Sequence, residues 1–153
     1  MILLRMAALF LLGTSFAFSQ QKPIESLPIK LGDTYEQVKA AYQTPLEPEP
    51  APSTVKGATQ LRLKTKGVWF FFNKDGKIYT IRLESPFPGS IGGVRIGDKV
   101  KDMQKVLGKP AKVPSTPLPA VIGQRFVYYL DDITTAVFQA NGDDEVEIVY
   151  LVK

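Results

Sequence analysis

Hydrophobic and polar positions alternate along several short segments of this chain, which is the pattern of half-buried β-strands. Thr59 to Thr65 alternates leucines with basic residues, and Val68 to Phe72 is apolar throughout. Asn73 to Gly76 then places Asp-Gly between two apolar runs, which is typical of a hairpin turn. We therefore predict antiparallel strands over 59–65, 68–72 and 77–83.

The same succession comes again near the C-terminus. Strands are expected over 125–130, 134–140 and 145–152, and the last two are separated by the turn signal Asn141 to Asp144. This second group therefore predicts another three-stranded antiparallel meander.

A segment with helical spacing precedes each group of strands. Residues 29–45 align without a gap on residues 94–110, 65 positions later, and both segments close with Pro. Asp33 and Asp98 stand where helix N-caps are expected, and Glu36 has the spacing of a capping box with Asp33. Each segment therefore predicts one short helix.

Together these patterns predict an α+β fold. We expect a single domain over 20–153, made of two tandem repeats at about 27–85 and 92–153. Each repeat would be a short helix followed by a three-stranded antiparallel meander, with the sheet packed against the helices. The Pro-rich segments 45–52 and 110–119 are expected to be extended loops.

Residues 1–19 have the pattern of a secretory signal peptide. Arg5 precedes an apolar stretch from Ala7 to Phe18, and small residues allow cleavage after Ser19 or after Ala17. An uncleaved anchor is the alternative, although the stretch is short for crossing a bilayer. We expect a cleaved, periplasmic or secreted chain without a transmembrane segment.

Composition narrows the chemistry that the chain can perform. It has no Cys and no His, which excludes thiolate nucleophiles, a Ser-His-Asp triad and Cys or His metal ligands. The net charge of +4 comes from basic residues scattered among acidic ones, so we expect no nucleic-acid partner. Acidic clusters near Asp131 and Asp143 are typical of turns, while a carboxylate-dependent hydrolase is a third hypothesis. We predict no enzyme activity, no cofactor and no metal.

The hairpin turn decides which residues share a face of the predicted sheet. If Lys74 to Gly76 forms a three-residue loop, Phe72 opposes Ile78. A four-residue turn would exchange the faces. The expected helix-covered face carries Val68, Phe70, Phe72, Ile78 and Thr80, with Ala136, Phe138, Ala140, Val146 and Ile148 as their counterparts. The expected opposite face carries Trp69, Phe71, Tyr79, Ile81, Leu83, Val149 and Leu151.

The aromatic residues of the opposite face form the candidate binding site, because exposed aromatics are typical of a contact surface. The alternative is that the first Pro-rich loop or Phe87 packs over them, which the apolar residues on the same face favour. The candidate residues are Trp69, Phe71 and Tyr79 as anchors, with Arg82 and Tyr150 at the rim.

Nearly the whole mature chain resembles a known group, and short motifs carry the resemblance. The pattern runs from Ile29-x-Leu31-Gly32-Asp33-Thr34, through a helix end with Pro, to Phe72-Asn73-x-Asp75-Gly76-Lys77-Ile78. It is similar to the tandem repeat of the β-lactamase-inhibitor-protein-like (BLIP-like) fold, and to the SmpA/OmlA domain of small outer-membrane lipoproteins. The resemblance implies a periplasmic or secreted, non-enzymatic protein-binding module. The chain lacks the lipid-acceptor Cys and the disulfide cysteines of these groups.

These observations favour an exported module that binds another envelope or secreted protein through its sheet, as an inhibitor, an immunity-type protein or an assembly accessory. The alternative is a periplasmic carrier that holds an apolar small ligand between helix and sheet. The oligomeric state stays open, because an open edge strand permits dimers.

Overall fold

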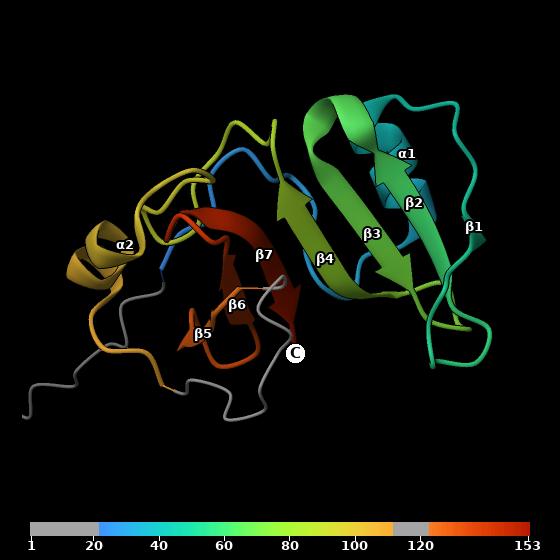
Figure 1. Ribbon diagram of the computed structural model, residues 1–153. Helices are drawn as coiled ribbons and strands as arrows, with labels where there is room; N and C mark the ends of the chain where they lie inside the picture. Colours follow the sequence, from blue (N-terminus) through green and yellow to red (C-terminus); the bar gives the residue numbers. More distant parts are fainter. Residues whose placement is uncertain (1–21, 112–122) are drawn as a thin grey trace, which may run out of the picture.

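The computed structural model describes residues 22–111 and 123–153, so the signal peptide predicted at 1–19 lies outside the described residues. A seven-stranded antiparallel sheet dominates, with the strand order β1-β2-β3-β4-β7-β6-β5 (Figure 1). In chain order the described elements are α1 (Tyr35–Tyr42), β1 (Glu49–Pro50), β2 (Thr59–Leu63), the 3-10 turn η1 (Lys64–Lys66), β3 (Val68–Phe72), β4 (Ile78–Glu84), α2 (Val100–Leu107), β5 (Arg125–Tyr129), β6 (Thr135–Ala140) and β7 (Val146–Val152).

The predicted α+β fold of two tandem helix-plus-meander repeats is wrong. The described chain is mostly one continuous sheet, and α1 and α2 have only 8 residues each. β4 pairs with β7 from Thr80–Val152 to Glu84–Ile148, while β1 arises inside the first Pro-rich segment and pairs with β2. The sequence pattern missed both pairings because contacts between distant segments leave no local periodicity.

The strands themselves lie where alternation predicts them, and β2 to β7 differ from the expected ranges by no more than two residues. The first hairpin also has the expected three-residue loop. Gly76 adopts a left-handed φ of 69°, and Phe72 opposes Ile78. Local sequence therefore specifies the strands and this turn.

Both helices begin one residue later than predicted, so the assignment of Asp33 and Asp98 as N-caps is wrong. Thr34 is the N-cap of α1, and its capping partner is Gln37 rather than Glu36. The Asp33 carboxylate instead accepts a hydrogen bond from the Lys30 N–H at 2.9 Å. Asp98 accepts one from the N–H of Arg95 at 2.8 Å in the corresponding turn, so each Asp closes the turn before its helix.

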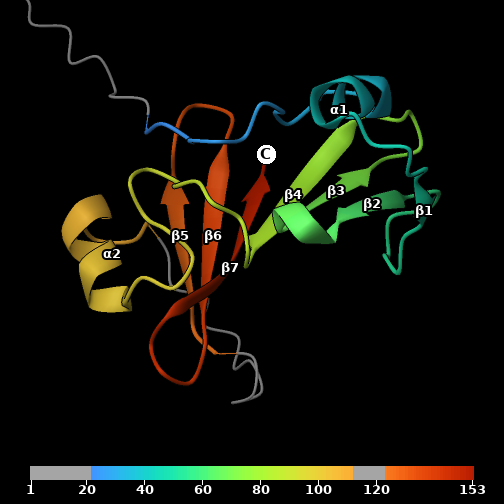
Figure 2. The ribbon, with the colours of Figure 1, turned by 90° about the horizontal axis from the view of Figure 1, so that it is seen from above.

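The core lies between one face of the sheet and the segments that cover it. α1 and α2 lie over opposite ends of the sheet, and residues 22–31, hereafter the strap, run between them (Figure 2). Val38 of α1 and Met103 of α2 are fully buried in the same apolar cluster as Phe70. Val106 of α2, by contrast, is 58% exposed. Within the described ranges, neither helix is long and apolar enough to cross a membrane.

Candidate functional site

The two faces of β3 have different neighbours. Val68, Phe70 and Phe72 are buried in the core, while Trp69 and Phe71 between them are only half-buried. Because successive side chains of a strand point to opposite faces, Trp69 and Phe71 lie on the face that turns away from the core. This placement agrees with the prediction for both aromatic residues.

A β-bulge in β4 changes the rest of the predicted face. Phe72 opposes Ile78 but Phe71 opposes Thr80, so Tyr79 is an extra residue in the strand. One inserted residue reverses the alternation that follows it. Thr80 therefore lies beside Phe71, and Ile81 lies in the core opposite Phe70, each on the face opposite to the predicted one.

The same irregularity occurs in β7. Ala140 opposes Val146 but Gln139 opposes Ile148, so Glu147 is the extra residue there. The predicted faces of Ile148, Val149 and Leu151 are wrong for the same reason, as is that of Leu83 in β4. With Ile81, Leu83, Val149 and Leu151 all buried in the core, the apolar neighbours that favoured a covered aromatic cluster are absent from its face.

A row of alternating cationic and aromatic side chains crosses this outer face. Trp69 stands between Arg62 of β2 and Arg82 of β4, which are its direct cross-strand partners. The guanidinium carbons lie 3.8 and 4.7 Å from the centre of its ring, within the range of cation–π attraction. Arg82 also lies 5.9 Å from the ring of its partner Tyr150, which Arg125 of β5 approaches to 5.8 Å. We call Arg62, Trp69, Arg82, Tyr150 and Arg125 the cation–aromatic row.

Glu84 holds the centre of the cation–aromatic row in place. Its carboxylate accepts a hydrogen bond from the indole Nε1 of Trp69 at 2.8 Å. It also forms ion pairs with Arg82 at 2.6 Å and with Arg62 at 3.6 Å. The carboxylate is 19% exposed, so it is screened less by water than a surface ion pair. One acid thus orients an indole and two guanidinium groups.

The other predicted aromatics extend the row along β3 and β4. Phe71 stacks beside Trp69 with ring centres 6.4 Å apart, and Tyr79 lies at the same distance from Phe71 in a tilted arrangement. The Tyr79 hydroxyl lies 3.2 Å from the Ser53 hydroxyl, so the loop after the first Pro-rich segment reaches this end. Phe87, the other proposed cover, is buried in the core cluster.

The structure therefore brings the five predicted site residues onto one face, and sequence reasoning missed Arg62, Glu84 and Arg125. Alternation put Arg62 on one face of the first strand, but its place beside Trp69 follows from the β2–β3 register, which the sequence pattern did not predict. Arg125 carried no such signal, because it approaches Tyr150 only through the β4–β7–β6–β5 strand order.

The acidic clusters lie in turns. The Asp131 carboxylate accepts hydrogen bonds from the N–H groups of Ile133 and Thr134. Glu145 pairs with Lys99 at 2.9 Å, and the Lys99 ammonium lowers the pKa of that carboxyl.

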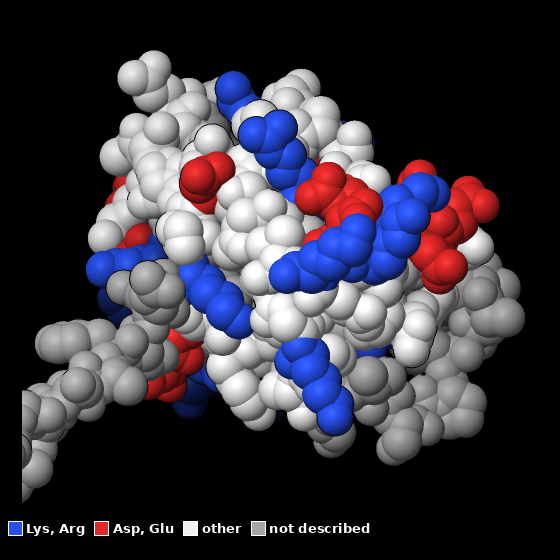
Figure 3. Space-filling view, turned by 90° about the vertical axis from the view of Figure 1, so that its left-hand side faces the viewer, with Lys and Arg blue, Asp and Glu red and all other residues white. Residues whose placement is uncertain are grey.

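Basic and acidic side chains are interspersed on the face in Figure 3. In the described part of the chain, no three Asp, Glu, His or Cys side chains gather as possible metal ligands.

Comparison with known proteins identifies a similar fold. No family model and no curated protein matches the chain. A solved structure does: the crystal structure of a DUF4309 family protein, YjgB, from Bacillus subtilis subsp. subtilis str. 168 has a TM-score of 0.53 and 22% sequence identity. The match covers 78% of this chain and 77% of that one. At this identity the likeness shows the fold alone.

Proposed function

We propose that this chain is an exported, non-enzymatic module that binds another envelope or secreted protein through the outer face of its sheet. The observation that carries the proposal is the cation–aromatic row, which crosses the face that turns away from the core. Trp69, Phe71 and Tyr79 are the anchors, and Arg82 and Tyr150 extend the contact toward β5.

The residue types of the row support binding to a protein. Trp, Tyr and Arg are the side chains that most often dominate the energy of protein–protein interfaces. Here Glu84 and the two guanidinium groups hold Trp69 in place, so Trp69 would lose little further side-chain freedom when a partner binds. Packing does not require these aromatics, because the core is built on the opposite face.

The resemblance to BLIP-like and SmpA/OmlA-like proteins supports the same class of function. Those groups are exported, and the inhibitors meet their partner through a sheet. For this chain the classes to test are inhibitors, immunity-type proteins and accessories of envelope assembly.

Capture from periplasmic extract tests the proposal. Immobilised mature protein is compared with Trp69→Ala, and the captured proteins are quantified by mass spectrometry. We expect a defined set of partners to be enriched by the wild type and reduced about tenfold or more by the variant, as for an interface anchor. Val106→Ala, which truncates an exposed apolar side chain on α2, is the matched control and should capture normally. Equal capture by Trp69→Ala would contradict the use of this face.

A carrier function is the second candidate, and a cavity beneath the strap favours it. This space of about 460 Å³ is lined mainly by apolar side chains, among them Ile24, Leu27, Ile81 and Leu151. Pockets of this size and lining accommodate small apolar molecules. Native mass spectrometry of the purified chain should then show an added mass that disappears on organic extraction. A ligand-free mass together with no uptake of an added lipid would argue against a carrier.

A further inference from the structure

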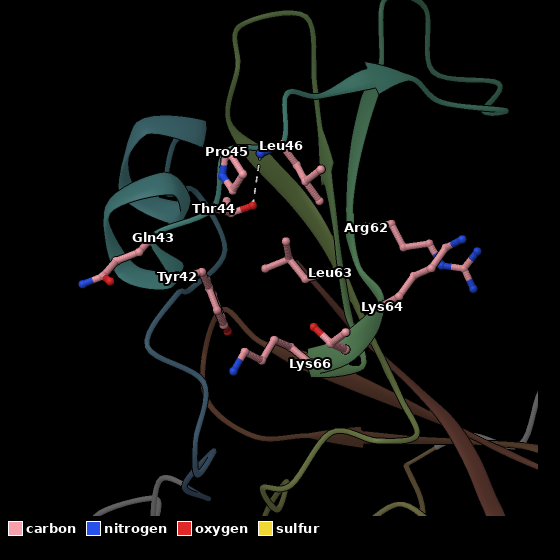
Figure 4. Close-up of a pocket in the computed structure, with 10 residues that line it drawn as sticks. Tyr42, Gln43, Thr44, Pro45, Leu46, Arg62, Leu63, Lys64 and Lys66 are labelled. Atoms are coloured by element: carbon pink, nitrogen blue, oxygen red, sulfur yellow. Dashed lines mark hydrogen bonds between the residues drawn. The ribbon is translucent and has the colours of Figure 1, made fainter.

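A second cavity lies beside one end of the cation–aromatic row, whose Arg62 is among its lining residues, and away from the strap. It has a volume of about 500 Å³ and opens between the C-terminal end of α1 and the β2–η1 segment (Figure 4). Leu63, which is 6% exposed, forms part of its apolar wall, together with Pro45 and Leu46. The ring of Tyr42 completes this wall and packs on Phe70 with ring centres 5.7 Å apart.

One end of this cavity is polar. The Tyr42 hydroxyl is shielded from solvent and has no hydrogen-bond partner among the described residues. A buried hydroxyl without a partner is costly, so a ligand that supplies one gains affinity. The Tyr42 hydroxyl and the Lys66 ammonium are directed toward the same end of the cavity in Figure 4. Lys66 itself has no ion-pair partner within the described part of the chain.

The charges around the cavity favour an anion. Arg62, Lys64 and Lys66 all line it, and none of the described lining residues is acidic. Arg62 and Lys64 point away from the cavity, which leaves Lys66 as the cation that faces a ligand (Figure 4). Burial raises the pKa of Tyr42 to about 12, so its hydroxyl stays protonated at neutral pH. Hydroxyl and ammonium are then both donors, and their complement is an acceptor such as a carboxylate.

We propose that this cavity binds a small amphiphile with an apolar body and one carboxylate. The body lies along Leu63 and Pro45, and the carboxylate accepts hydrogen bonds from Tyr42 and Lys66. The volume falls within the range of ordinary small-molecule pockets. This site shares Arg62 with the edge of the cation–aromatic row, but the groups that would hold the carboxylate, Tyr42 and Lys66, belong neither to that row nor to the cavity beneath the strap.

Titration with decanoate, followed by calorimetry and by NMR of the leucine methyl groups, tests the proposal. We expect decanoate to bind and to shift the Leu63 methyl signals, and decanol to bind about tenfold more weakly because it lacks the charge. Lys66→Met should weaken decanoate binding about tenfold and leave decanol binding unchanged. Tyr42→Phe should also weaken decanoate binding, because it removes the hydroxyl donor. The ring remains, so the apolar wall of the cavity is kept.

Two controls separate this site from the others. Lys101→Met removes the same charge from an exposed position on α2 and should bind decanoate like the wild type. Trp69→Ala should also bind it normally, while Lys66→Met should capture proteins normally, so that this proposal and the protein-binding proposal fail separately. Equal affinity for decanoate and decanol, no binding, or shifts at Leu151 of the strap cavity instead of Leu63 would each overturn the proposal.

Discussion

Trp69 and Tyr42 show how two aromatic residues of one chain acquire different chemistry from their neighbours. The indole of Trp69 has its N–H paired with Glu84 and its ring between two guanidinium groups. The phenol of Tyr42 packs on Phe70 with its hydroxyl unpaired. Trp69 is therefore held in one orientation on the outer face of the sheet, and Tyr42 has a hydrogen-bond donor without a partner in the cavity that it lines.

The raised pKa of Tyr42 predicts a dependence of stability on pH. Burial favours the protonated hydroxyl in the folded chain, where the pKa is about 12 against the ordinary value of 10.0. Between these values the folded state holds a proton that the unfolded state has lost, so this contribution is complete below pH 10 and disappears as the pH rises toward 12. Between pH 10 and 12 the free energy of unfolding should therefore fall more steeply in the wild type than in Tyr42→Phe. The difference should be on the order of 1 kcal/mol, because solvent partly screens the half-buried phenol.

Urea denaturation of wild type and Tyr42→Phe across this pH range measures the effect. Tyr129→Phe, at a side chain that is 65% exposed, is the control and should follow the wild type. If the stabilities of wild type and Tyr42→Phe run parallel up to pH 12, the hydroxyl does not titrate as described.

At the scale of elements, the two helices differ in how they begin. α1 starts with a capping box in which the Thr34 hydroxyl accepts from the Gln37 N–H and the Gln37 side chain accepts from the Thr34 N–H. The N-cap of α2 is Lys99, whose side chain makes no cap hydrogen bond. The first N–H groups of any helix have no partner within the helix. In α1 the N-cap side chain supplies a partner and in α2 it does not, so α1 depends more on its N-cap residue than α2 does.

Thr34→Ala should therefore lower the free energy of unfolding by about 1 kcal/mol, the usual contribution of a Thr N-cap. Lys99→Ala changes the corresponding position of α2 and removes an exposed ion pair with Glu145 and an exposed hydrogen bond to the Asp143 carbonyl, so its effect should stay below about 0.5 kcal/mol. Chemical denaturation of both variants gives the comparison, and an equal loss in the two would show that the α1 cap contributes nothing specific.

At the scale of the whole molecule, the β4–β7 pairing makes one sheet and one core of the described chain. The core cluster includes Val38 from α1, Met103 from α2 and Ile81 from the central strand β4. Ile81 stands between Phe70 of β3 and Leu151 of β7. Neither end of the sheet can lose its packing without exposing the apolar surface of this centre.

The chain should accordingly unfold in a single transition, and Ile81→Ala should destabilise both ends together by about 3 kcal/mol. Hydrogen exchange measures this, as an equal loss of amide protection in β2–β3 and in β5–β6. Val106→Ala on the surface of α2 should change protection little. Two separate transitions, or a loss confined to β2–β4, would show that the two ends fold independently.

The sequence by itself determined the strands, the first hairpin loop and the aromatic side chains of β3. Alternation and turn residues act over a few positions, so Phe72 opposite Ile78 and the outward direction of Trp69 and Phe71 could be read directly. Only the tertiary structure decided the sheet order, the bulges and the complete row. A bulge at Tyr79 reverses the faces of all later residues of β4, and Arg125 meets Tyr150 through strands far apart in the chain. Such pairings are selected by the burial of one shared core, which no local pattern records.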